Sequence, residues 1–180
     1  HAAAERLQAA QGLRGVVLDE QRVGEVAVGV LCGPVAQQEF SMRCSYCEWR
    51  CELGPERYGR CRMYFAEEDT VKERFPDSWC TYEVLRIESI PFYHVRPGSR
   101  CLSIGTSSCN FSCKYCSNAF IAKQDPLQMQ EKMFSFTSQR LVAMALKLGC
   151  TSIVFNVNEP AVSLPSLQAL AREAKAAGLA

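Results

Sequence analysis

Three closely spaced cysteines in the second half of the chain constrain its fold and chemistry most. They lie in the segment Cys109-Asn-Phe-Ser-Cys113-Lys-Tyr-Cys116, with C-x3-C-x2-C spacing, directly after the apolar run 102–106. Such a run predicts a buried strand, which places the cysteines on the loop at its C-terminal end. Three thiolates on one loop can hold three irons of a [4Fe–4S] cube and leave the fourth iron open to a small molecule. A structural zinc site is normally closed by four ligands, so a zinc knuckle is the weaker alternative, as are cysteines buried only as small hydrophobes.

A second group of cysteines precedes this loop with C-x2-C-x3-C-x9-C spacing. Its members are Cys44, Cys47, Cys51 and Cys61. Four thiolates with turn-forming Gly54, Pro55 and Gly59 between them can close a tetrahedral shell around zinc. Thiolate ligands also suit an iron–sulfur cluster, so the pattern favours zinc but leaves a second cluster open.

Composition and charge narrow the functional classes. The chain has 180 residues and is 48% hydrophobic, enough for one cored domain and a small appendage. Its net charge of +1 gives no electrostatic footprint for nucleic acid, and no apolar run approaches a bilayer span. Seven of the 11 cysteines fall in the two groups, and the first residues given, His1-Ala-Ala-Ala-Glu-Arg, do not resemble the long apolar stretch of a signal peptide. This usage favours metal ligation in a reducing compartment, and cytoplasm is the expected location.

The first half of the chain predicts two small modules. Residues 1–43 form a β-rich appendage, with alternating valines in 23–31. Residues 44–80 form the four-cysteine metal-binding module, in which the mixed-charge stretch 67–77 is expected to be solvated surface. A strand is expected in 82–90.

Residues 81–180 predict the start of a parallel α/β domain. After the strand at 102–106, residues 125–132 are expected to be a connecting loop. A helix follows from 137 to Gly149, then a strand at 152–156, then a helix from 163 to Gly178. A βαβα order implies a parallel sheet with helices outside it.

At the three-cysteine loop the chain resembles the radical S-adenosylmethionine (SAM) superfamily, whose signature is C-x3-C-x-aromatic-C, with Tyr115 at the aromatic position. The earlier cysteines, followed by Gly-x-Cys and by the segment Pro97–Thr106, resemble the AmmeMemoRadiSam-type branch, which is related to pyruvate formate-lyase activating enzymes. The resemblance covers about residues 44–162. Residues 1–43 resemble no family that we can name.

This resemblance implies the N-terminal part of a radical SAM βα barrel that binds a [4Fe–4S] cluster and SAM. Tyr115 is implied to lie against the adenine. Most of the superfamily has Gly-Gly-Glu after the second strand, whereas this chain has Asn158-Glu159-Pro160, as the named branch does. Glu159 is implied to pair with the SAM ammonium group, with Asn158 beside it. The alternative for Glu159 is a carboxylate favoured by a helix N-terminus.

The implied activity is reductive cleavage of SAM to a 5′-deoxyadenosyl radical, which modifies a protein or a small molecule, as an activase does. An electron donor such as flavodoxin or ferredoxin is the implied partner. The alternative is a non-enzymatic iron–sulfur or zinc module that binds a partner or transfers electrons. A complete barrel takes about 250 residues. The 71 residues from Asn110 to Ala180 suffice for two βα units, so the sequence predicts an incomplete barrel.

Overall fold

The computed structural model describes residues 41–180, which belong to one compact unit. The strands predicted in 1–40 lie outside the described residues. Among the described residues, none of the helices has both the length and the apolar character that crossing a bilayer requires.

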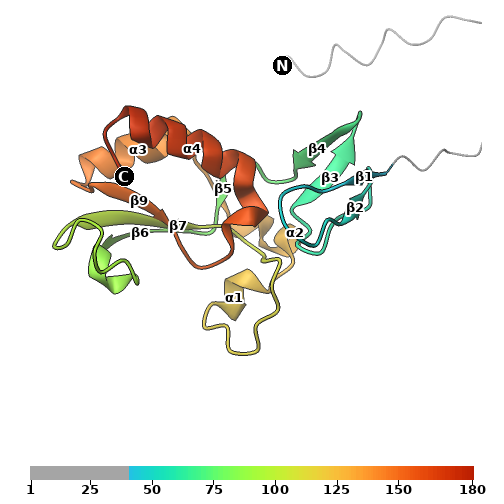
Figure 1. Cartoon of the computed structure of the whole chain (residues 1–180), viewed down its shortest axis with the longest axis horizontal. Helices are drawn as coiled ribbons and strands as arrows, with labels where there is room; N and C mark the ends of the chain where they lie inside the picture. The colour runs from blue at the N-terminus through green and yellow to red at the C-terminus, as the bar shows by residue number, and fades with distance from the viewer. Residues whose placement is uncertain (1–40) are drawn as a thin grey trace, which may run out of the picture. The chain divides into compact units, whose positions relative to one another are not determined.

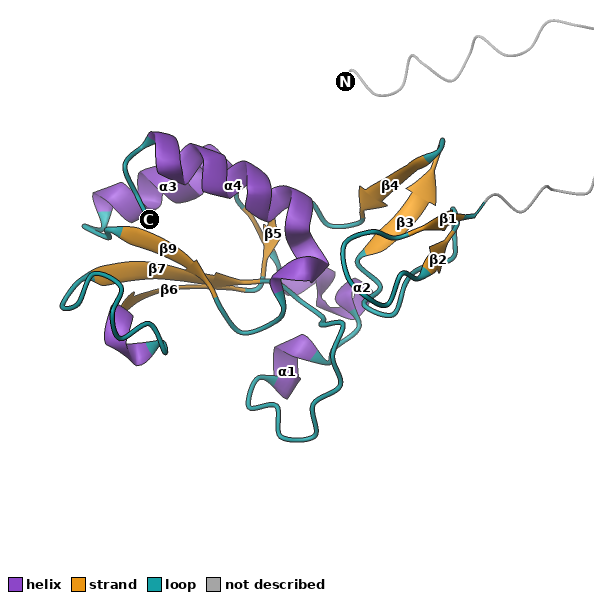
Figure 2. Ribbon diagram, in the orientation of Figure 1, coloured by secondary structure: helices purple, strands orange, loops and turns teal. Residues whose placement is uncertain are grey.

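The fold is mixed α/β (Figures 1 and 2). The strands are β1 Met42–Arg43, β2 Glu52–Leu53, β3 Tyr64–Glu67, β4 Thr70–Glu73, β5 Ser78–Trp79, β6 Thr81–Arg86, β7 Arg100–Gly105, β8 Phe134–Ser135 and β9 Ser152–Phe155. The α-helices are α1 Ala119–Ala122, α2 Pro126–Met129, α3 Ser138–Lys147 and α4 Leu164–Ala176, and the 3-10 turns are η1 Ile87–Ser89, η2 Gln130–Lys132 and η3 Pro160–Ser163. Between residues 41 and 180 the strands form four small sheets, and none of them closes into a barrel.

The largest sheet has the order β6-β7-β9 and places the three-cysteine loop. Strand β7 runs antiparallel to β6 and parallel to β9, with Cys101 opposite Ser152. Both faces of β7 are covered. Leu102 and Ile104 pack under α3 and α4, while Cys101 packs against η1 on the other face. The predicted parallel βα order of this half is therefore present in β7, α3, β9 and α4.

Local signals in the sequence set the limits of the two long helices. The Thr137 side chain accepts a hydrogen bond from the Arg140 N–H at 3.3 Å and caps α3. Gly149 and Gly178 follow the ends of α3 and α4 with φ of 68° and 76°, a conformation that glycine adopts without steric cost. Both helices begin and end close to the predicted residues.

Two segments differ from the sequence expectations. The stretch 67–77, expected to be solvated surface, contains the turn of the hairpin β3–β4 and the strand β4, and the turn residues Glu68 and Asp69 have φ of 49° and 60°. Two positive φ values in a two-residue loop match the twist of a tight hairpin, although neither residue is glycine. The expected loop 125–132 contains α2 and η2, because Pro126 begins α2 and the Asp125 carboxylate accepts from the Leu127 N–H at 3.0 Å.

The four-cysteine module has its own small core and is tied to the larger sheet. Leu53, Met63 and Tyr64 are buried in this core together with Val162 from η3. The Tyr64 hydroxyl donates to the Ala161 carbonyl at 2.7 Å and accepts from the Leu164 N–H at 2.9 Å. One buried phenol thus joins hairpin β3–β4 to the start of α4.

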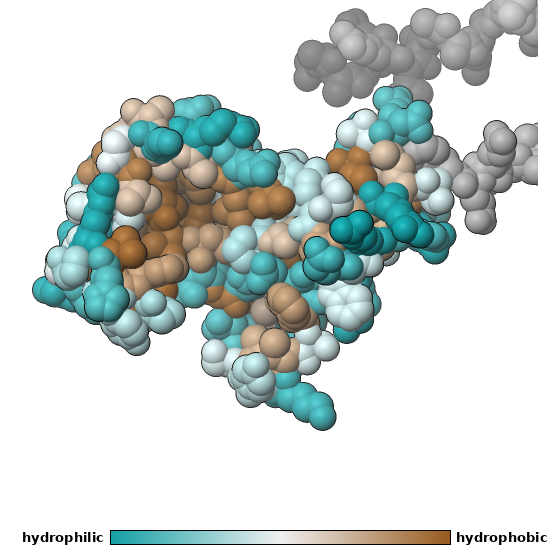
Figure 3. Space-filling model, viewed as in Figure 1, coloured by the Kyte–Doolittle hydropathy of each residue, from teal (hydrophilic) through white to brown (hydrophobic). Residues whose placement is uncertain are grey.

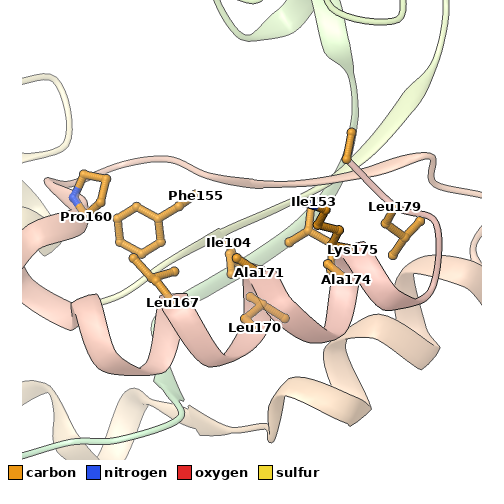
Figure 4. A pocket seen from close by; sticks show the side chains of 11 residues that line it. Ile104, Ile153, Phe155, Pro160, Leu167, Leu170, Ala171, Ala174, Lys175 and Leu179 are labelled. Carbon is orange, nitrogen blue, oxygen red and sulfur yellow. The ribbon is translucent and has the colours of Figure 1, made fainter.

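An apolar hollow of about 490 Å³ lies between β9 and α4 (Figure 3). Figure 4 shows Phe155 and Ile153 facing Leu167 and Leu170 across it. Strand β9 is the last strand of its sheet, and Ala180 bonds to the Ile153 N–H and the Thr151 carbonyl beside it. Among the described residues that line the hollow, only Lys175 has a titratable side chain, so these residues offer packing area rather than reactive groups.

Replacing Tyr64 by Phe tests the link between the module and the sheet. Tyr64→Phe removes the hydroxyl from a position that is 1% exposed and leaves one carbonyl and one N–H without a partner. We expect a loss of about 1–3 kcal/mol in the free energy of unfolding, measured by urea denaturation. The control, Tyr82→Phe on the exposed face of β6, should change it by less than about 0.5 kcal/mol. Equal losses in the two variants would contradict this account.

Candidate metal centres

The three-cysteine loop begins at the C-terminal end of β7. The base of the loop, next to the strand, is buried, and its tip is exposed. Thr106, Ser107, Ser108 and Asn110 are 0–6% exposed, whereas Phe111 is 53% exposed. Cys109, Cys113 and Cys116 are free thiols of intermediate exposure. Because the base contains buried polar groups, it needs hydrogen-bond partners from the surrounding structure.

Asn158 supplies three of these hydrogen bonds. Its Oδ1 accepts from the Thr106 N–H at 3.3 Å, and its Nδ2 donates to the Ser107 and Ser108 carbonyls at 3.3 and 2.7 Å. Asn158 follows β9, and β9 lies parallel to β7, so the two strands end at the same edge of the sheet. One amide therefore joins the loops that leave both strands. The sequence analysis singled out Asn158 as a SAM neighbour and missed this role.

A second amide holds the far end of the loop. Asn118 Nδ2 donates to the Val157 carbonyl at 3.1 Å, so both ends of the cysteine loop are hydrogen-bonded to the turn after β9. Val157 has φ of 82°, which is a true outlier for a β-branched residue. Such strain persists only where the surroundings hold it, and it concentrates at functional sites. The sequence analysis did not identify Asn118, and its place two residues after Cys116 is the only local signal.

Close packing at the end of β7 explains a glycine at this edge. A Cβ at Gly105 would lie 2.8 Å from the Asn156 carbonyl oxygen and 2.9 Å from Thr81 Oγ1. Distances this short force the backbone apart. Gly105 thus permits the close approach of β7 to the turn that carries Asn158.

The aromatic residues of the loop point away from its base. The side chain of Tyr115 is 90% exposed and that of Phe120 is 67% exposed. These rings present a large exposed apolar area at the tip of the loop.

Glu159 is half-buried on the turn after Asn158. It stands at the N-cap position of η3, yet its side chain makes no capping hydrogen bond. Glu159 thus lies at a helix N-terminus, and its carboxylate makes no hydrogen bond to that helix.

The four cysteines of the N-terminal module line one small cavity, together with Gly59 and Asn110. The Cys44 N–H bonds to the Cys51 carbonyl at 2.8 Å, and a Cβ at Gly59 would lie 3.2 Å from the Cβ of Cys51. Burial above all, together with the three neighbouring thiols, raises the pKa of the Cys61 thiol to about 11. A bound cation would reverse this effect by favouring the thiolates.

The two cysteine groups adjoin each other. The Ser108 hydroxyl donates to the Cys61 carbonyl at 2.6 Å, and Asn110 lines the four-cysteine cavity. Arg60 Nη2 bonds weakly to Ser112 Oγ at 3.5 Å. The base of one loop is therefore part of the wall of the other site.

The donor sets fit soft metals in number and type, since all seven side chains are free thiols on two adjoining loops. As the side chains stand, residues 41–180 contain no group of three or more His, Cys, Asp or Glu side chains arranged to hold a metal ion. The fit is one of donor chemistry and placement. It is not a preformed coordination shell.

Three other cysteines in the described part of the chain lie outside both groups. Cys101 and Cys150 are buried in the cores on the two faces of the sheet, and burial raises the pKa of the Cys80 thiol to about 11. A buried neutral thiol behaves as a small hydrophobe, so we assign Cys101 and Cys150 to packing.

No protein-family model, no curated protein and no solved structure matches this chain.

Replacing Asn158 by Asp tests the amide that joins the two loops. Asn158→Asp keeps the shape but replaces two donated hydrogen bonds with a carboxylate facing the Ser107 and Ser108 carbonyls. We expect a loss of about 1–3 kcal/mol in the free energy of unfolding, together with faster amide hydrogen exchange in 106–110. The control is Asn156→Asp on the same turn. If amide hydrogen exchange in residues 106–110 were unchanged in Asn158→Asp, the proposed role of the Asn158 amide as a clamp between the two loops would be refuted.

Proposed function

We propose that the protein is a radical SAM enzyme in which Cys109, Cys113 and Cys116 hold a [4Fe–4S] cluster. When bound, this cluster supplies the one electron that cleaves SAM into methionine and a 5′-deoxyadenosyl radical. The observation that carries the proposal is the placement of the C-x3-C-x-Tyr-C loop. It leaves a buried strand at the same edge as the turn after the parallel neighbour, and two amides hold it there.

The proposal assigns separate tasks to residues at this edge. The three thiols leave one iron without a protein ligand, which is the position that SAM needs. Glu159, whose carboxylate caps no helix, binds the SAM ammonium group. The backbone at Tyr115 lies against the adenine. Asn158 acts as a positioning residue for the loop.

The architecture proposed for the whole enzyme is a βα barrel that begins with β7 and β9. The parallel β7–β9 pair and the helices α3 and α4 on one face support this proposal. The resemblance to activating enzymes favours a protein substrate, and a small molecule is the other option. Flavodoxin or ferredoxin is the proposed reductant, and cytoplasm the proposed compartment.

The four-cysteine module is proposed to hold a structural zinc ion. Its four thiols line one cavity whose wall includes Asn110 of the catalytic loop. Closing a four-ligand shell there stabilises the hairpins that hold Cys61, and thereby the hydrogen bond from Ser108.

A non-enzymatic electron-transfer module is the second candidate. The direct contact between the two cysteine groups, through Ser108 and Cys61, favours it, because adjoining iron–sulfur centres can exchange electrons. This reading requires iron at both sites and no SAM cleavage.

SAM cleavage separates the two candidates. After anaerobic reconstitution and reduction, the wild-type chain should form 5′-deoxyadenosine, measured by chromatography, and SAM should change the EPR signal of the cluster. Cys113→Ala should lower product formation by more than about 100-fold, since even partners outside the ligand shell contribute up to about that factor. The matched control Cys150→Ala, at the opposite end of β7, should retain activity. A reduced cluster that neither responds to SAM nor yields product would reject the enzyme.

Metal analysis tests the assignment of the two sites. Anaerobically purified protein should contain about four irons and one zinc per chain. Cys61→Ser should lose zinc and keep most of the iron. About eight irons and no zinc would replace the zinc assignment with a second cluster and leave the first site unaffected.

A further inference from the structure

A cavity of about 260 Å³ beside the three-cysteine loop is lined by three cationic side chains. Arg60 and Arg62 flank Cys61, the last cysteine of the four-cysteine module, and Lys123 follows α1. Cys109 and Ser112 complete the wall on the side of the loop. Segments about 60 residues apart in sequence therefore bring positive charge to the edge of the proposed catalytic site.

The positive charge in this cavity exceeds the negative charge beside it. None of the residues in 41–180 that line it is acidic. Asp125 pairs with Arg62 at 2.5 Å from the neighbouring cavity and also caps α2, so it is already engaged. Arg60, Arg62 and Lys123 against Asp125 leave two positive charges, in a chain whose total net charge is +1. A cavity with this surplus favours an anionic ligand.

The cations are held in place before any ligand arrives. The Arg60 guanidinium stacks over the Trp49 ring at 4.0 Å and donates to Ser112 Oγ. Lys123 Nζ donates to the Cys113 carbonyl. Each of these groups keeps further N–H donors free, because arginine has five and lysine three. Pre-organised donors lose less conformational entropy on binding.

A larger cavity of about 460 Å³ shares Arg60 and Arg62 with the first. It adds Arg74, whose guanidinium stacks over Tyr58 at 3.7 Å, and the apolar side chain of Leu127. The shared arginines therefore face one space that suits a small charged group and another that suits a larger, partly apolar one.

We propose that the cavity lined by Arg60, Arg62 and Lys123 binds the phosphate group of a small phosphate-bearing molecule. A phosphate monoester carries about −1.5 to −2 charges near neutral pH and matches the surplus of two positive charges, which one carboxylate does not. Planar guanidinium groups match phosphate oxygens with paired hydrogen bonds. That the bound molecule is the substrate of the enzyme rests on the proposed function and on the position of Cys109 beside the cavity. That the cavity binds phosphate does not depend on the proposed function.

Calorimetric titration of the full chain with inorganic phosphate tests the site. Wild-type protein should bind phosphate, and added sodium chloride should weaken the binding. Arg60→Gln and Lys123→Gln should each raise the dissociation constant by about tenfold or more, since each removes a charged hydrogen-bond donor. The matched control Arg57→Gln removes an arginine that pairs with Glu52 at 3.0 Å outside the cavity, and it should bind as wild type does. Thermal melts of all variants verify folding.

Two further measurements, a titration with acetate and the assay of SAM cleavage, complete the test. Acetate should bind at least about tenfold more weakly than phosphate, because it compensates only one charge. Absence of phosphate binding, equal binding of acetate, or equal weakening by Arg57→Gln overturns the phosphate site. Phosphate binding in a protein that does not cleave SAM supports the site and rejects only the proposed function.

Discussion

The side-chain amide of Asn158 is the interaction on which the candidate site depends. A loop that leaves a buried strand carries backbone groups that no ladder satisfies, and such groups are costly unless they find partners. Asn158 meets three of them, at Thr106, Ser107 and Ser108, from the turn after the neighbouring strand. Because β7 and β9 are parallel neighbours, Asn158 lies close to the start of the cysteine loop, and Gly105 lets the backbone of β7 approach the turn after β9.

This clamp gives the loop a rigid base and a free tip. The base is buried and hydrogen-bonded, while Tyr115 is 90% exposed. The hydrogen-bonded base fixes where the first thiol lies, and the other two thiols lie on the more exposed part of the loop. The contrast agrees with a site whose coordination shell is completed on binding rather than in advance.

The N-terminal module acts as part of the same site. Tyr64 ties it to the start of α4, Ser108 bonds to Cys61, and Arg60 reaches Ser112. Changes in the four-cysteine group therefore reach the three-cysteine loop through two direct hydrogen bonds, between Ser108 and Cys61 and between Arg60 and Ser112. Arg60 and Arg62 of the same module line the proposed phosphate cavity beside Cys109, so the four-cysteine module also supplies most of its positive charge.

The sequence by itself determined the elements whose signals are local. The buried run became β7, the glycines 149 and 178 ended α3 and α4, and cysteine spacing identified both candidate centres, because periodicity and turn chemistry report on near neighbours. Only the tertiary structure decided which distant residues meet. Asn158 bonds to Ser108, 50 residues away, and Arg62 pairs with Asp125, 63 residues away. Such contacts follow from strand order and packing. Polar residues on loops have no periodic sequence pattern from which these contacts could be predicted.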